Sequence, residues 1–258
     1  METHAHHIHK APGKKLWHFF FEFFMLFLAV FCGFLAENIR EHKIEGDRAN
    51  EFSKSLIQDL QNDLVAIRTH KKSAAIYMAV ADSLIRLSQT KLEGNNSARF
   101  SFYTRFAYWT QPLVWNRATF EQIKNSGSLR YFKNQTLLGE IMKYDMLIND
   151  IESEAYNRQV RGNMLVNQIN KIIDPVYHQK LSRYFLYDLD TLSGTTIESL
   201  YPASPESLEN KRSEIREMLN MVVVQQRNLR RDSDRLLGNA EEMAAELISE
   251  LEKEYPVE

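Results

Sequence analysis

An apolar run near the start of the chain covers residues 16–36. Between Phe19 and Ala36 it contains a single ionisable residue, Glu22, in 18 positions. A helix of that length spans roughly 27 Å, close to the ~30 Å hydrocarbon core of a bilayer. The pattern therefore predicts a transmembrane helix over residues 16–36.

A helical pattern follows this run without a break. Apolar residues recur at alternating spacings of three and four, and Lys71 is the one polar position in the series. The apolar members are Ile57, Leu60, Leu64, Ile67, Ala74, Met78, Ala81 and Ile85. This heptad spacing, as found in coiled coils, predicts a long helix over residues 37–91. Gly46 is a candidate kink, and Gly94 and Asn95 are expected to end the helix.

The second half of the chain predicts two more long helices. Asn134 is the expected N-cap of one, which ends at Asp174 because the residue before a proline leaves the helical region. Ser204 is the expected N-cap of the last helix, which ends before Pro256. Its heptad series is Leu208, Arg212, Ile215, Leu219, Val222, Gln226, Leu229, Ser233, Leu236, Ala240, Met243 and Leu247. Between the long helices we expect short helical segments over 116–125, 128–134 and 175–189, a turn over 126–128 and a loop over 190–203.

These long helices can bury their apolar faces only against one another. We therefore expect an all-α fold, with one N-terminal transmembrane helix followed by an antiparallel bundle of long helices with short capping helices. The domains that follow are a short polar tail rich in His and Lys over 1–15, the transmembrane helix over 16–36, and a helical-bundle domain over 37–258.

One face of the predicted transmembrane helix combines a carboxylate with small residues. Its members are Glu22, Leu26, Ala29, Gly33 and Ala36. Small residues four apart, as at Ala29 and Gly33, allow membrane helices to approach closely. We expect this face to pack against another membrane helix, with Glu22 hydrogen-bonded there. The alternative is that Glu22 lies near the membrane surface and extends to the interface.

Aromatic residues cluster between the first two long helices. The cluster includes Phe102, Phe106, Trp109 and Trp115. The favoured interpretation is a hydrophobic plug that covers one end of the bundle. The alternative is a surface patch that binds a partner.

Composition narrows the classes of function. The 258 residues include only 9 Gly and 6 Pro, which favours long helices, and the net charge of -2 argues against a nucleic-acid partner. Cys32 is the single cysteine, so no disulfide can form within one chain. The sequence contains no nucleophile elbow, P-loop, His-Glu-x-x-His or Glu-x-x-His motif, so we expect neither an enzyme nor a cofactor. The tail holds His4, His6, His7 and His9, which we interpret as solvated rather than metal-bound.

The apolar run has one rival interpretation, a cleaved signal peptide. The run exceeds the usual ~7–15 residues of such a segment, and cleavage after Ala36 would place Phe34 where a small residue is needed. We therefore expect an uncleaved anchor. Its orientation stays open, because three basic residues flank the run on each side within about 15 residues. These are Lys10, Lys14 and Lys15 before it, and Arg40, Lys43 and Arg48 after it.

Several motifs occur in a recognisable order. A membrane segment with a Glu precedes the charged juncture at residues 37–41, and Leu56-Ile57-x-Asp59-Leu60 follows. The turn motif at residues 118–129 and Tyr144 complete the order. Over residues 16–150 the chain resembles a family of uncharacterised single-pass envelope proteins, a domain of unknown function common in Bacteroidota. The resemblance implies an inner-membrane anchor with a cytoplasmic N-terminus and an extracytoplasmic, periplasmic bundle. It transfers no functional residues.

Two functions remain for such a chain. We expect a membrane-anchored interaction or scaffold protein whose partners, besides the lipid bilayer, are further copies of itself or another membrane protein. The alternative is a periplasmic module that senses a small ligand and acts through a separate membrane partner.

Overall fold

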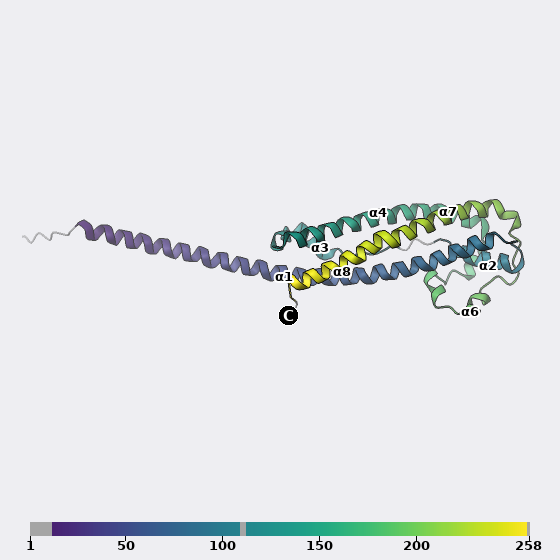
Figure 1. Ribbon diagram of the computed structural model, residues 1–258, viewed down its shortest axis with the longest axis horizontal. Coiled ribbons are helices and arrows are strands. Elements are labelled where there is room, and N and C mark those ends of the chain that lie inside the picture. Colours follow the sequence, from purple (N-terminus) through teal and green to yellow (C-terminus); the bar gives the residue numbers. More distant parts are fainter. Residues whose placement is uncertain (1–11, 109–111, 257–258) are drawn as a thin grey trace, which may run out of the picture. The chain divides into compact units, whose positions relative to one another are not determined.

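The computed structural model describes residues 12–108 and 112–256. All regular elements in these residues are helical, so the predicted all-α class is confirmed (Figure 1). The chain divides into two compact units, one ending at Phe52 and one covering Ser53–Glu258. We call the second of these the bundle unit.

The first helix is longer than either segment predicted for it. Helix α1 covers Pro12–Ser88, and Gly46 does not interrupt it. Its apolar residues and its heptad series therefore belong to one continuous helix.

The remaining elements follow the predicted order with some changed boundaries. They are α2 (Gly94–Arg105), α3 (Ala118–Asn125), the 3-10 turn η1 (Ser128–Tyr131), α4 (Gln135–Ile172), α5 (Pro175–Lys180), the 3-10 turn η2 (Leu186–Asp190), α6 (Gly194–Ser199), the 3-10 turn η3 (Glu209–Lys211), α7 (Arg212–Arg231), the π-helical turn η4 (Asp232–Leu236) and α8 (Leu237–Glu254). As predicted, Asn134 caps α4, since its side-chain oxygen accepts a hydrogen bond from the Leu137 amide at 3.1 Å.

Three local predictions are wrong. Gly94 begins α2 with a φ of 51° instead of only ending α1, and the expected loop over 190–203 contains α6. Ser204 caps no helix, because the segment after it is bound to the loop before α2. The Leu208 amide donates to the Leu92 carbonyl at 3.0 Å, and the Ser97 hydroxyl donates to the Glu206 carbonyl.

The directions of the long helices differ from a simple antiparallel bundle. At one end of the bundle unit the Tyr144 hydroxyl of α4 donates to Asp63 of α1 at 3.0 Å. At the other end Lys211 donates to the Ile172 carbonyl, and Arg212 donates to the Ser88 carbonyl. Helices α1 and α4 therefore run in the same direction, and α7–α8 runs antiparallel to both (Figure 1).

Because α1 and α4 are parallel, the chain between them returns along the bundle unit. Helix α2 lies at the end where α1 finishes, whereas the Asn116 amide donates to Asp63 at 2.8 Å at the opposite end. Short elements thus cover both ends, as expected, with α2 at the end where α1 finishes and α3 at the opposite end.

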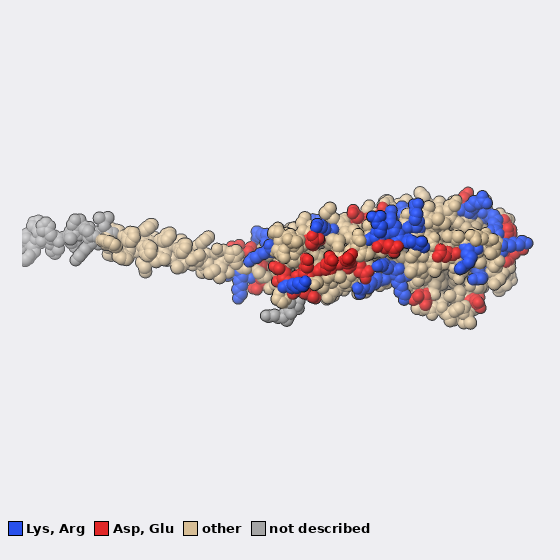
Figure 2. Space-filling model, viewed as in Figure 1, with Lys and Arg blue, Asp and Glu red and all other residues tan. Residues whose placement is uncertain are grey.

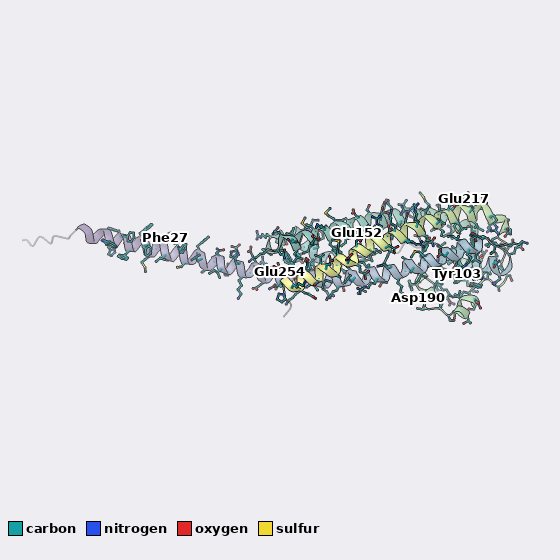
Figure 3. All side chains as sticks on the ribbon, viewed as in Figure 1. Phe27, Tyr103, Glu152, Asp190, Glu217 and Glu254 are labelled. Atoms are coloured by element: carbon teal, nitrogen blue, oxygen red, sulfur yellow. The ribbon has the colours of Figure 1, made fainter. Side chains whose placement is uncertain are left out.

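Buried side chains occur along the whole bundle unit, whose side chains are drawn in Figure 3, and one hydrophobic cluster joins α1 from Ala74 onward with α2, the end of α4 and α7. The largest fully buried side chains of the unit are Tyr77, Phe100, Phe102, Phe106, Phe132, Ile67, Leu84, Leu92, Ile123, Leu137, Leu165 and Leu181. Each large apolar side chain buried in this way contributes about 1.5–3 kcal/mol. The bundle unit therefore has a hydrophobic core of its own.

The buried face of α1 is shifted from the predicted one. Leu60, Ile67, Ala74 and Ala81 are buried as expected. The intervening buried positions lie one residue earlier than predicted, at Asp63, His70, Tyr77 and Leu84 instead of Leu64, Lys71, Met78 and Ile85. Two polar residues thus enter the core of the bundle unit.

Candidate functional site

The predicted membrane-packing face lies along one side of α1 and is exposed. Glu22, Leu26, Ala29, Gly33 and Ala36 are all solvent-accessible. A Cβ atom added to Gly33 would meet no atom within 4 Å. No partner chain is present, so the packing of this face against another helix stays a prediction.

The same helix exposes large apolar side chains all round. They are Trp17, Phe19, Phe20, Phe21, Phe23, Phe24, Met25, Leu26, Phe27, Val30, Phe31, Phe34 and Leu35. The most apolar 18-residue window has a mean hydropathy of 2.3 and none of it is buried. In the face seen in Figure 2 the apolar part of α1 is uniformly tan, whereas acidic and basic side chains cover the bundle unit. Among the described residues, α1 is the one helix long and apolar enough to cross a membrane.

The aromatic residues predicted as a plug or a partner patch are buried where the structure describes them. Phe102, Phe106 and Trp115 lie in the interior, and Trp109 falls outside the described residues. The ring of Phe102 contacts those of Phe106 and Tyr201 with centroids 5.2 and 5.3 Å apart. Phe102, Phe106 and Trp115 are therefore part of the core, and the prediction that they form a surface patch for a partner is wrong.

A buried charged group was not predicted from the sequence. Arg158 of α4 donates to Asp232 at 2.9 Å, and the two side chains are only 7% and 5% exposed. His70 of α1 is buried beside them. Burial and the positive charge of Arg158 lower the pKa of His70 to about 4, although Asp232 opposes this. We call His70, Arg158 and Asp232 the core polar layer.

The backbone at Asp232 accommodates this layer. Asp232 begins the π-helical turn, which widens the helix by one residue between α7 and α8. Buried positions before the turn include Val222, Gln225 and Leu229, and the pattern resumes at Leu237 instead of the predicted Leu236. The extra residue therefore moves the apolar face of α8 back onto the core.

A second polar network fixes the return connection. Asp63 accepts hydrogen bonds from the Asn116 amide and side chain and from the Tyr144 hydroxyl. Burial raises the pKa of Asp63, and these hydrogen bonds oppose the rise. Asp59 accepts from the Thr119 amide at 3.2 Å in the same way. These carboxylates hold the start of α3 against α1 and α4.

The polar positions of the second heptad also have structural partners. Arg212 donates to the Ser88 and Thr90 carbonyls at 2.6 Å and so caps the end of α1. Gln226 donates to Asp82 at 2.7 Å. Their polarity therefore reflects contacts between α1 and α7.

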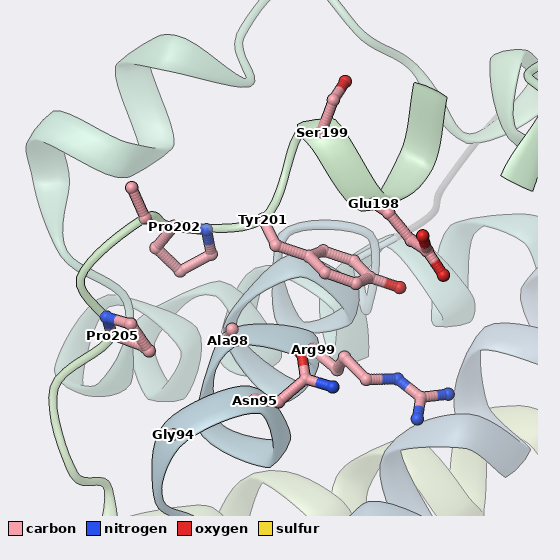
Figure 4. A pocket seen from close by; sticks show the side chains of 10 residues that line it. Gly94, Asn95, Ala98, Arg99, Glu198, Ser199, Tyr201, Pro202 and Pro205 are labelled. Atoms are coloured by element: carbon pink, nitrogen blue, oxygen red, sulfur yellow. The ribbon is translucent and has the colours of Figure 1, made fainter. Parts of the chain in front are cut away.

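A surface cleft lies beside the first turns of α2 and has a volume of about 780 Å³. Arg99, Tyr201 and Glu198 direct their polar groups toward one side of it (Figure 4). Tyr201 is hydrogen-bonded to Arg99 and Tyr103, and partial burial is the main cause of its raised pKa. The cleft thus presents a cation and a carboxylate, a pair suited to a small zwitterionic ligand.

Within residues 12–108 and 112–256, no three His, Cys, Asp or Glu side chains come together in a way that could hold a metal ion. No family model, curated protein or solved structure matches the chain.

Proposed function

We propose that the chain is an integral membrane protein anchored by residues 16–36, and that its bundle unit works as an interaction or scaffold domain. The exposed apolar surface of α1 supports the anchor most directly. Leaving one large apolar side chain in water costs about 2 kcal/mol, and this helix carries many. Lipid is the environment that removes this cost along all sides of a helix.

Carbonate extraction of membranes tests the anchor. The full chain is expected in the pellet, and residues 37–258 alone in the soluble fraction. Recovery of the full chain in the soluble fraction would exclude an integral anchor.

The proposed location is the inner membrane, with the N-terminus in the cytoplasm and the bundle unit in the periplasm. The family resemblance supports this orientation, since the flanking charges are balanced. A protease added to spheroplasts should degrade the bundle unit while a cytoplasmic control protein stays intact. Protection of the bundle unit would reverse the orientation.

The interaction role is supported by the organisation of the bundle unit. Its core is covered by its own helices, and the buried Arg158–Asp232 and Tyr144–Asp63 contacts are made within the unit. The unit is therefore a preformed body that can present outer surfaces to a second copy or another membrane protein. Chemical cross-linking of the full chain in native membranes should give a discrete larger species. A monomer without cross-linked partners would contradict the proposal.

A ligand-sensing role is the second candidate, and the cleft beside α2 favours it. A zwitterionic ligand would pair its carboxylate with Arg99 and its ammonium group with Glu198. Thermal-shift measurements with a panel of amino acids test this role. Stabilisation should occur with the wild type and be lost in Arg99→Ala, and absence of any shift would exclude this ligand class.

A further inference from the structure

The outer side of α4 carries a second regular pattern. Its exposed members are Met142, Met146, Asn149, Ser153, Tyr156, Val160, Met164 and Asn167. At 3.6 residues per turn, these positions lie within about 40° of one line along the helix. We call this line of residues the outer stripe. It is separate from the buried face of α4, which contains Tyr144, Ile148, Ile151, Leu165 and Ile169.

The outer stripe contains no charged residue, although charged residues make up 26% of the chain. Asp145 and Glu152 flank one side of it, and both are paired with Arg117. On the other side Glu154 is paired with Arg231 at 3.1 Å. These three carboxylates are therefore paired within the chain and would not strongly repel a second surface, whereas Asp150, about 80° from the stripe on the side of Glu154, is exposed.

We propose that the outer stripe is the surface through which two copies of this chain pair, α4 against α4. The exposed parts of its five apolar side chains amount to roughly 1,000 Å² over two copies, which is about the minimum for a specific interface. An interface of that size is weak for freely diffusing proteins. Anchoring both copies in one membrane raises their effective concentration, so the inference rests on the proposed anchor.

The order of residues in the stripe makes it complementary to itself. In a parallel pair each residue meets its own copy. An antiparallel pair would place the two anchors at opposite ends, because α1 runs in the same direction as α4, so copies anchored in one membrane pair in parallel. The parallel arrangement brings apolar side chains together and places Ser153 opposite Ser153. This symmetry favours a second copy over an unrelated partner.

Disulfide cross-linking of the full chain in membranes tests the pairing. Cys32 is the single native cysteine, so Cys32→Ser provides a clean background. Ser153→Cys should give a covalent dimer upon oxidation with copper phenanthroline. Gln159→Cys is the matched control, because it is exposed on the same helix but lies about 100° away from the stripe.

A second substitution tests the chemistry of the surface. Introducing Met146→Glu and Tyr156→Glu into the Ser153→Cys chain should reduce the dimer at least five-fold, since carboxylates would replace apolar contacts. Val65→Glu is the control, because Val65 is 65% exposed on α1 and Met146 is 66% exposed. Circular dichroism should show unchanged helix content in all variants.

The outcomes separate this inference from the proposed anchor. Equal cross-linking of Ser153→Cys and Gln159→Cys, with the chain retained in carbonate-washed membranes, overturns the pairing and leaves the anchor intact. Loss of the chain from those membranes refutes the anchor itself. Met146→Cys alone should also give a dimer, as a parallel pair requires, and a dimer that requires both Met146→Cys and Val160→Cys chains would overturn the proposed pairing.

Discussion

Replacing His70 should remove a large pH dependence from the stability of the bundle unit. In the folded protein the pKa of His70 is lowered to about 4, first by burial and then by Arg158, from an ordinary value of 6.5. The unfolded chain therefore binds a proton more readily than the folded one. The resulting stabilisation, about 3 kcal/mol, is fully present above pH 6.5 and is lost as the pH falls through 4.

About 2 kcal/mol of this contribution should disappear between pH 7.5 and pH 5. Urea unfolding of residues 37–258, followed by circular dichroism at both pH values, measures it. The difference between wild type and His70→Gln cancels the titration of Asp63 and other shared groups. His42→Gln replaces an exposed histidine and is the control.

Parallel stability profiles for wild type and His70→Gln over this range would refute the reasoning. They would mean that His70 is not held neutral beside Arg158 and Asp232. A change of about 2 kcal/mol that His42→Gln does not reproduce would support the buried, neutral state.

Three further substitutions test other contacts. Arg158→Met should destabilise the bundle unit by about 2 kcal/mol in urea unfolding, since Asp232 stays buried and keeps Arg231 as its charged partner, and no loss would contradict the contribution of the buried pair. Tyr144→Phe should cost about 1–2 kcal/mol in the same assay because Asp63 loses a hydrogen-bond donor, and no loss would show that the bond is unimportant. Gly33→Ile fits a single copy without a clash. It should therefore lower cross-linking of the full chain in membranes only if the face that contains Glu22 packs against another helix. Unchanged cross-linking would refute the packing of that face.

The sequence predicts the long helices well because apolar periodicity and capping are local. Asn134 forms the expected cap, and Leu60 and Ile67 are buried as predicted. The burial of Asp63 and His70 was not predictable from that pattern, because the alternating spacing of three and four selects their neighbours Leu64 and Lys71 instead. Their burial depends on partners distant in sequence.

Neither the core polar layer nor the directions of the helices could be predicted from the sequence. A pattern that assumes a uniform helix does not detect the extra residue at Asp232, so Leu237 and Ala244 are buried in place of Leu236 and Met243. Ala240 and Leu247 are buried as predicted. The parallel relation of α1 and α4 depends on Asp63 binding Asn116, 53 residues later in the chain. A sequence read one segment at a time contains no signal for such a contact.

The apolar surface on all sides of α1 could be assigned from the sequence alone, since a helix that is apolar all round is typical of a membrane span or a buried core. The outer stripe of α4 could not be separated from the buried face of that helix in advance. Both lines carry apolar residues at helical spacing, and only the positions of α7 and α8 decide which line is covered.

The order of the helices along the chain also sets how long α1 waits for α8 during synthesis. Arg68 of α1 and its partner Glu241 of α8 are 173 residues apart. At about 5–20 residues per second, a ribosome needs roughly 10–35 s to produce the second after the first. During that interval the part of α1 that packs against α8 has no native cover. Chains that terminate early within α8 should therefore be preferred targets of chaperones and proteases.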